Sequence, residues 1–224
     1  MELFDIFFPK YCVVCKKVGK YLCDKDKAKI KPAKSFCPVC TKAAITGATH
    51  AQCKTRLSLD GLVCLFDYSS PIKEIIQSLK YRFVQDLKKV LVSEVRNVNI
   101  LDRIDFDAFI LLPIPLSSLR QNWRGFNQTE VLGEIIAKKL KIPFEKSILL
   151  KSRETKPQAT LTKKERSRQI AGVFQIKNPE LVSGKNFIVF DDVWTTGATM
   201  KAAVKILKYK KANKVWGITL ASSH

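Results

Sequence analysis

The sequence lacks cysteine after Cys64 and is poor in acidic residues, and each shortage excludes a class of protein. All seven cysteines fall within the first 64 of 224 residues, which argues for metal binding and against a disulfide framework. Acidic residues number 20 against 40 basic ones, for a net charge of +20. No fold requires that imbalance, so it points to a polyanionic partner, either nucleic acid or an anionic surface.

Long apolar runs and a secretory leader are also missing. No run approaches the roughly 20 apolar residues that a membrane helix needs. The first nine residues contain Glu2 and Asp5 and lack the basic segment of a signal peptide. We therefore expect a soluble, cytoplasmic protein without a transmembrane segment.

The cysteines predict a zinc-binding head over residues 1–60. Two Cys-x2-Cys pairs, Cys12 with Cys15 and Cys37 with Cys40, are separated by 21 residues, slightly more than in a zinc ribbon. Four thiolates within tetrahedral reach suit a structural Zn²⁺ ion. The head is also rich in lysine, which suits contact with nucleic acid as well as simple solubility.

A second set of candidate ligands has the same spacing within its pairs, Cys23 with Asp26 and His50 with Cys53. Asp26 is the weakest candidate, because a solvated surface acid explains it at least as well. The Cys12/Cys15 and Cys37/Cys40 pairs could share one ion, and the other two pairs could share a second ion. Alternatively the pairs combine in chain order, with Cys12, Cys15, Cys23 and Asp26 around one ion and Cys37, Cys40, His50 and Cys53 around the other.

Residues 61–224 predict one α/β domain. Apolar runs predict strands at 62–68, 109–112, 187–190 and 214–220. Periodic apolar residues predict helices at 72–79, 87–95, 131–140 and 200–212. Strands that alternate with helices form right-handed βαβ units, so we expect a mostly parallel sheet. Cys64, alone in the first strand, is interpreted as a core residue.

The most informative stretch is residues 187–199. Four apolar residues form an expected strand that ends at two carboxylates, Asp191 and Asp192. A loop rich in hydroxyl groups and glycine then leads into a helix, whose N-terminus offers free N–H groups and a positive dipole to a phosphate. Adjacent carboxylates can accept hydrogen bonds from sugar hydroxyls or help to hold Mg²⁺. The stretch therefore predicts a site for a ribose phosphate.

This stretch resembles the phosphoribosyl-pyrophosphate (PRPP) signature of type I phosphoribosyltransferases, in which two acids are followed by Thr-Thr-Gly-x-Thr. The resemblance implies that Asp191 and Asp192 bind the 2- and 3-hydroxyls of the ribose and that PRPP arrives with Mg²⁺. It also implies a sheet of the type I phosphoribosyltransferase kind. The residues that would surround the 5-phosphate are Thr195, Thr196, Gly197, Ala198 and Thr199. No Gly-Lys-Ser/Thr is present, which weakens a P-loop interpretation.

Two basic segments are candidates for binding the pyrophosphate group of PRPP. Arg120 and Arg124 follow the Pro-Ile-Pro at 113–115. Arg153 and Lys156 lie in the basic stretch 151–174, which we expect to be a mobile arm that closes over the site and excludes water. Arg124, Lys156 and the two aspartates are the residues that we expect to act in any transfer chemistry.

The chain as a whole resembles the ComF family of competence proteins. Beside the cysteine-rich head and the PRPP signature, the resemblance rests on Arg-Gly-Phe-Asn-Gln at 124–128 and on Arg153, Thr155, Gln158 and Leu161. It implies a cytoplasmic protein, with peripheral association with the inner membrane as a variant. It further implies handling of imported single-stranded DNA beside a helicase-like partner in natural transformation. The alternative is an active phosphoribosyltransferase with an unknown acceptor.

Overall fold

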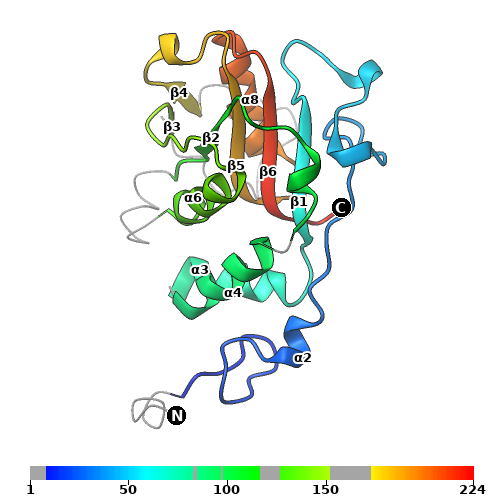
Figure 1. The fold of residues 1–224 in the computed structure, drawn as a ribbon, viewed down its shortest axis with the longest axis vertical. Helices are drawn as coiled ribbons and strands as arrows, with labels where there is room; N and C mark the ends of the chain where they lie inside the picture. Colours follow the sequence, from blue (N-terminus) through cyan, green and yellow to red (C-terminus); the bar gives the residue numbers. More distant parts are fainter. Residues whose placement is uncertain (1–8, 83–84, 97, 117–126, 152–172) are drawn as a thin grey trace, which may run out of the picture.

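The protein is described here by a computed structural model, which covers residues 9–82, 85–96, 98–116, 127–151 and 173–224 (Figure 1). The helices are α2 (Asp24–Lys27), α3 (Ile72–Arg82), α4 (Gln85–Arg96), α6 (Gln128–Leu140) and α8 (Ala198–Tyr209). The strands are β1 (Gly61–Asp67), β2 (Phe109–Pro113), β3 (Leu149–Lys151), β4 (Phe174–Ile176), β5 (Asn186–Trp194) and β6 (Val215–Ser222). Short 3₁₀ turns lie at Ile45–Gly47, Ala51–Cys53, Leu101–Arg103 and Pro179–Leu181.

The sheet is parallel, as predicted, with strand order β1-β6-β5-β2. Strands β5 and β6 are central, so β5, which carries the acidic pair, is hydrogen-bonded on both sides. The carboxyl ends of all four strands meet at one edge of the sheet, where open α/β sheets bind their ligands. A separate antiparallel pair is formed by β3 and β4.

The alternating side chains of the sheet supply two cores. One face of β5 places Ile188 and Phe190 in a cluster with α3, α4 and α6. The other face places Phe187 and Val189 in a cluster with α8 and the β3–β4 pair. Helices therefore cover both faces, which explains why the strands are almost continuously apolar.

Both outer strands of this sheet have their edges covered by irregular segments. Residues 31–33 run along β1, where Ala33 N–H donates to Leu65 O (3.2 Å) and Asp67 N–H donates to Lys31 O (2.9 Å). On the opposite side, Leu111 of β2 exchanges hydrogen bonds with the segment around Phe144. The chain between the two cysteine groups thus acts as an additional strand on the sheet.

Strand β5 is longer than the sequence predicted. It continues through both aspartates to Trp194, because β6 extends alongside it as far as Ser222 and pairs Asp191 with Thr219 and Trp194 with Ser222. The β3–β4 pair was not predicted either. Among the described residues, no helix has the length and apolar character needed to cross a membrane.

Candidate phosphate-binding loop and metal centres

The loop between β5 and α8 lines a small pocket of about 100 Å³. The five residues predicted to surround a phosphate, 195–199, all line it, together with Asp191 and Thr219. Gly197 precedes the helix with φ = 71°, a conformation that favours glycine. The first turn of α8 carries N–H groups that have no partner within the helix. The loop therefore combines backbone donors, hydroxyl groups and the positive end of a helix dipole in one place.

The structure separates the two aspartates. Asp191 lines the pocket, next to Thr219 on the neighbouring strand. Asp192 is half-buried and does not line it, and its N–H donates to Asp191 Oδ1 (2.8 Å). Both residues belong to β5, where successive side chains point to opposite faces. Only Asp191 is thus directly placed beside the loop.

Two residues near the loop were not predicted as site residues. His224 Nε2 lies 2.8 Å from Thr195 O, although no motif in the sequence indicates a role for this histidine. Lys201 Nζ donates to Thr196 O (3.3 Å) and lies 5.3 Å from the centre of the Trp194 ring. No local pattern indicates the His224 contact, because 29 residues separate the partners.

The predicted pyrophosphate residues Arg120, Arg124, Arg153 and Lys156 lie outside the described residues, so their roles stay predictions. The described residues on either side of 117–126 are joined by hydrogen bonds to Ile114 O. Asn127 caps α6, accepting from Thr129 N–H (3.2 Å) and donating to Ile114 O (3.2 Å). Thr129 Oγ1 donates to the same carbonyl (2.6 Å). Asn127, the asparagine of Arg-Gly-Phe-Asn-Gln, therefore has a structural role as the cap of α6.

The eight candidate ligands of the head combine in chain order. Within each group the potential ligand atoms all lie within 4.8 Å of one another. The first group is Cys12, Cys15, Cys23 and Asp26, and the second is Cys37, Cys40, His50 and Cys53. Of the two pairings that the sequence left open, the chain-order one is therefore supported, and the joining of the Cys12/Cys15 pair with the Cys37/Cys40 pair is not, since the chain passes along β1 between them.

The first group includes Asp26 of α2 and packs on the face of the sheet that α3, α4 and α6 cover. Cys12 is fully buried in the same apolar cluster as α3 and α4. Asp26 is 1% exposed and contacts Cys12 Sγ (3.3 Å), Cys23 Sγ (3.2 Å) and Lys29 Nζ (2.7 Å). The expectation of a solvated surface acid is thus wrong. Lys29 and the neighbouring thiols hold the pKa of the Asp26 carboxyl well below its usual range.

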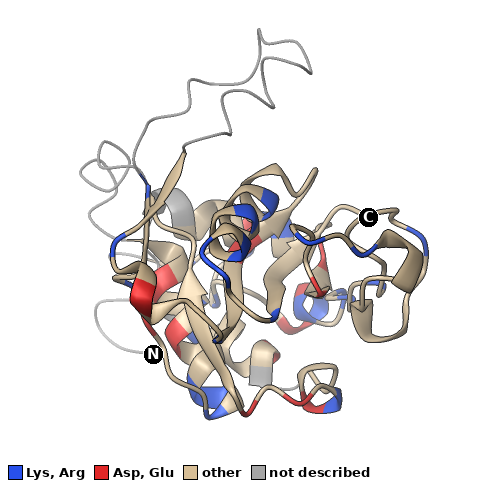
Figure 2. Cartoon of the chain, turned by 90° about the horizontal axis from the view of Figure 1, so that it is seen from above, with Lys and Arg blue, Asp and Glu red and all other residues tan. Residues whose placement is uncertain are grey.

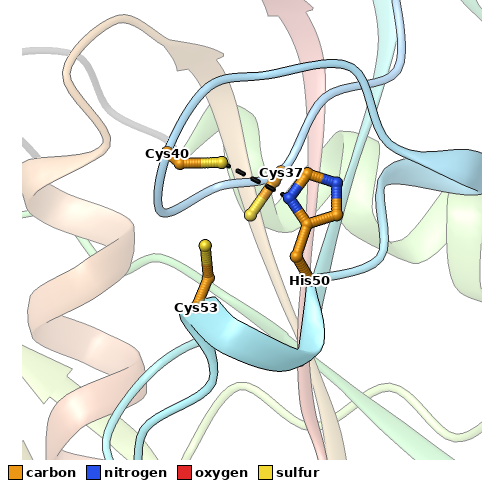
Figure 3. A group of neighbouring side chains, drawn as sticks. All are labelled: Cys37, Cys40, His50 and Cys53. Atoms are coloured by element: carbon orange, nitrogen blue, oxygen red, sulfur yellow. Dashed lines mark hydrogen bonds between the residues drawn. The ribbon is translucent and has the colours of Figure 1, made fainter.

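In the second group, the side chains of Cys37, Cys40, His50 and Cys53 point toward one another (Figure 3). Cys40 Sγ lies 3.4 Å from His50 Nδ1, and the other ring nitrogen, Nε2, lies 3.1 Å from Ala43 O. This second contact fixes the ring orientation and leaves Nδ1 facing the thiols. A carbonyl partner of this kind commonly orients a metal-binding histidine.

The separations within both groups are within a few tenths of an ångström of those around a tetrahedral ion. Bond lengths of about 2.3 Å for Zn–S and about 2.0 Å for Zn–N or Zn–O imply ligand–ligand separations of roughly 3.5–3.8 Å. The observed values are 3.7 Å between the sulfurs of Cys15 and Cys23, 3.4 Å for Cys40 and His50, and 3.2 Å for Cys23 and Asp26. The two groups could therefore each hold a metal such as zinc.

The thiol pKa values support the same chemistry. Burial raises the pKa of Cys37, but the backbone N–H groups of Cys40, His50 and Val39 outweigh it and bring the value to about 7. Burial and the neighbouring thiols raise the pKa of Cys53 to about 11. The Cys37 thiol thus ionises near neutral pH, whereas the Cys53 thiol resists a second negative charge. A divalent cation relieves that resistance, because thiolates are its ligands.

Comparison with known proteins shows what this part of the chain is similar to. Residues 128–224 match the sequence family described as Phosphoribosyl transferase domain. The match begins at α6, so β1 and β2 complete the sheet from outside it. Residues 128–224 are therefore similar in sequence to phosphoribosyltransferase domains, in agreement with the parallel sheet and the loop after β5.

Three relatives extend the comparison over most of the chain. Competence protein ComFC of Bacillus subtilis is 29% identical over 220 residues, covering 92% of this chain and 86% of its own. Competence protein F of Haemophilus influenzae is 28% identical and covers 96% and 99%. DNA utilization protein YhgH of Escherichia coli is 26% identical and covers 89% and 91%. The chain is thus similar over most of its length to proteins named as competence and DNA-utilization proteins, which agrees with the resemblance that its motifs carry.

Proposed function

We propose that this protein binds PRPP at the loop between β5 and α8 and acts in the handling of imported single-stranded DNA. The observation that carries the proposal is the pocket formed by residues 195–199 beside Asp191. It places hydrogen-bond donors for a phosphate next to a carboxylate that can bind the sugar hydroxyls, as a ribose phosphate requires. The competence and DNA-utilization names of the relatives support the DNA role.

Binding would use the described residues in distinct ways. The backbone N–H groups of the first turn of α8 and the hydroxyls of Thr195, Thr196 and Thr199 would hold the 5-phosphate. Asp191 would accept hydrogen bonds from the ribose hydroxyls. Carboxylate oxygens suit Mg²⁺, which would neutralise part of the pyrophosphate charge. We keep Arg120, Arg124 and Lys156 as the proposed pyrophosphate contacts and Asp192 as a second ribose contact.

We assign a structural Zn²⁺ ion to each cysteine group. A closed four-ligand site supplies folding energy rather than chemistry. Cys12, Cys15 and Cys23, with Asp26, would hold one ion. Cys37, Cys40 and Cys53, with His50, would hold the other. Each ion would stabilise a segment that has little regular secondary structure of its own.

The basic surface supports contact with single-stranded DNA. The head carries exposed lysines around the first group, among them Lys16, Lys17, Lys20 and Lys25. Figure 2 shows Lys and Arg on the head and on the α/β part alike. The attraction would therefore be spread over the molecule, with the sequence-independent character of phosphate contacts.

The PRPP assignment is tested by calorimetric titration of PRPP with Mg²⁺. We expect wild type to bind and the Asp191→Asn, Asp192→Asn double variant to lose binding while unfolding at a similar temperature. Of the single variants, Asp191→Asn should weaken binding more, because only Asp191 lines the pocket. Undiminished binding by a folded double variant would remove the assignment.

The DNA role is tested by titrating a fluorescent single strand at several salt concentrations. Neutralised phosphates release counterions, so the logarithm of affinity should fall steeply with the logarithm of salt concentration. A slope near zero would refute a phosphate-based contact. The alternative of an active transferase predicts pyrophosphate release from PRPP in the presence of a candidate acceptor, which the same protein samples can test.

A further inference from the structure

Phe36 links the second cysteine group to the proposed phosphate loop. It directly precedes Cys37 and pairs with Ala43 in the same turn, where Cys37 N–H donates to Lys42 O (2.8 Å). Its ring is 5% exposed and leaves this turn to pack in the cluster that contains α8. The position of the ring is therefore tied to the backbone that presents Cys37 and Cys40.

The Phe36 ring contacts two residues that hold the loop. Its centroid lies 6.3 Å from that of Trp194 and 5.4 Å from that of His224. His224 Nε2 lies 2.8 Å from Thr195 O. The Trp194 ring lies directly beneath Gly197, so close that a Cβ at Gly197 would overlap it. Phe36 thus touches both supports of residues 195–197.

Packing is what holds Trp194 in place. Its indole N–H is buried and has no hydrogen-bond partner among the described residues. Trp194 is 2% exposed. Burying an N–H group without an acceptor costs free energy, so hydrogen bonding does not favour the buried position of the ring. The neighbours of the ring must therefore fix it, with Phe36 on the side of the cysteine group and Gly197 on the side of the loop.

We propose that metal binding at the Cys37, Cys40, His50, Cys53 group positions the phosphate loop through Phe36, with Trp194 and His224 as the positioning residues. An ion there fixes the turn that carries Phe36, and Phe36 fixes the two supports of the loop. Binding at the two sites is then coupled, and the coupling is reciprocal, so that PRPP also tightens the hold on the metal.

The first cysteine group provides the matched control. Its buried Cys12 packs, with the neighbouring Leu22, in the other apolar cluster, on the face of the sheet away from α8. A metal lost there should destabilise the chain locally without moving the loop. The coupling is therefore specific to one of two chemically similar groups in the same chain.

The first test measures PRPP affinity, and this arm rests on the proposed function. Cys53→Ser should remove one zinc ion per chain and weaken PRPP binding by roughly 5- to 150-fold, the usual range of coupling between two sites. Phe36→Leu should weaken binding similarly. Cys15→Ser should also remove one zinc ion but leave affinity unchanged. Phe106→Leu, at a comparably buried ring on the other face, should leave it unchanged as well.

His224→Ala covers the case in which Phe36→Leu does not fold, because His224 is exposed and its removal leaves the core intact. It should weaken PRPP binding while the zinc content stays at the wild-type value. Wild-type affinity in all three variants, Cys53→Ser, Phe36→Leu and His224→Ala, would overturn the proposal.

The second test does not depend on PRPP. The chain has three tryptophans, so Trp123→Phe with Trp216→Phe leaves Trp194 as the only reporter. In that background Cys53→Ser should shift the Trp194 emission, whereas Cys15→Ser should not. The shift should be smaller when Phe36→Leu is already present. If wild type fails to bind PRPP but these shifts appear, the proposed function is wrong, whereas the positioning of the loop by the second cysteine group stands. Absent or equal shifts, or no zinc in the second group, would refute the coupling.

Discussion

Gly197→Ala should destabilise the protein more than Gly184→Ala, because only the first substitution places a Cβ against a buried ring. Gly197 has a positive φ, and an added Cβ would overlap three atoms of the Trp194 ring. Gly184 offers a matched control, because its φ of +73° is nearly the same as the +71° of Gly197 but nothing lies within 4 Å of an added Cβ. The two substitutions thus share the backbone strain and differ in the steric contact.

The magnitude follows from these two contributions. A left-handed conformation costs a residue with a Cβ about 1–2 kcal/mol, and this applies at both positions. Overpacking against a fixed neighbour adds about 1–3 kcal/mol, and this applies only at Gly197, because Trp194 is almost fully buried. We therefore expect a loss of about 2–5 kcal/mol for Gly197→Ala and about 1–2 kcal/mol for Gly184→Ala.

The assay is urea denaturation of both variants, alone and with Trp194→Ala. Removing the ring should abolish the additional cost of Gly197→Ala and leave the cost of Gly184→Ala unchanged. Gly197→Ala should also bind PRPP more weakly, because the loop must move to relieve the overlap with the Trp194 ring. Equal losses of stability at Gly197 and Gly184 in the wild-type background would refute the reasoning.

Three further predictions concern stability. Asp60 Oδ2 accepts from a largely buried lysine, Lys208, and from the N–H of Val215, each at 2.7 Å. Asp60→Ala should therefore cost about 2–4 kcal/mol in urea denaturation, and Asp60→Asn less. Burial raises the pKa of Cys64 to about 11, so the folded chain keeps this thiol protonated after the unfolded chain has ionised it. The stability from this group, about 3 kcal/mol, is fully present below about pH 9 and is lost as pH rises from there through 11. Cys64→Ala should show a flatter alkaline profile. Asn127→Ala removes a buried helix cap and should lower the free energy of unfolding by about 1–2 kcal/mol; an unchanged value would contradict the capping role.

Local chemistry made much of the architecture predictable. Apolar runs and helical periodicity in residues 61–224 identified all four strands of the parallel sheet and the helices between them, because these patterns follow from burial on one or two faces. The bounds were less predictable. Strand β5 continues past Phe190 to Trp194 because β6 offers hydrogen-bond partners there, and that partner lies some 30 residues away in the chain.

The sequence by itself determined the ligand chemistry, namely two sets of thiolate-rich ligands and a hydroxyl-rich loop after two acids, because these depend on residue type and short spacing. Only the tertiary structure decided how the ligands combine, since the pairs are kept apart by the segment that runs along β1. It also decided that Asp191 and not Asp192 lines the pocket, and that Phe36 and His224 reach the loop. Such contacts join residues far apart in the chain, so their geometry is set by how the sheet and its covering segments pack.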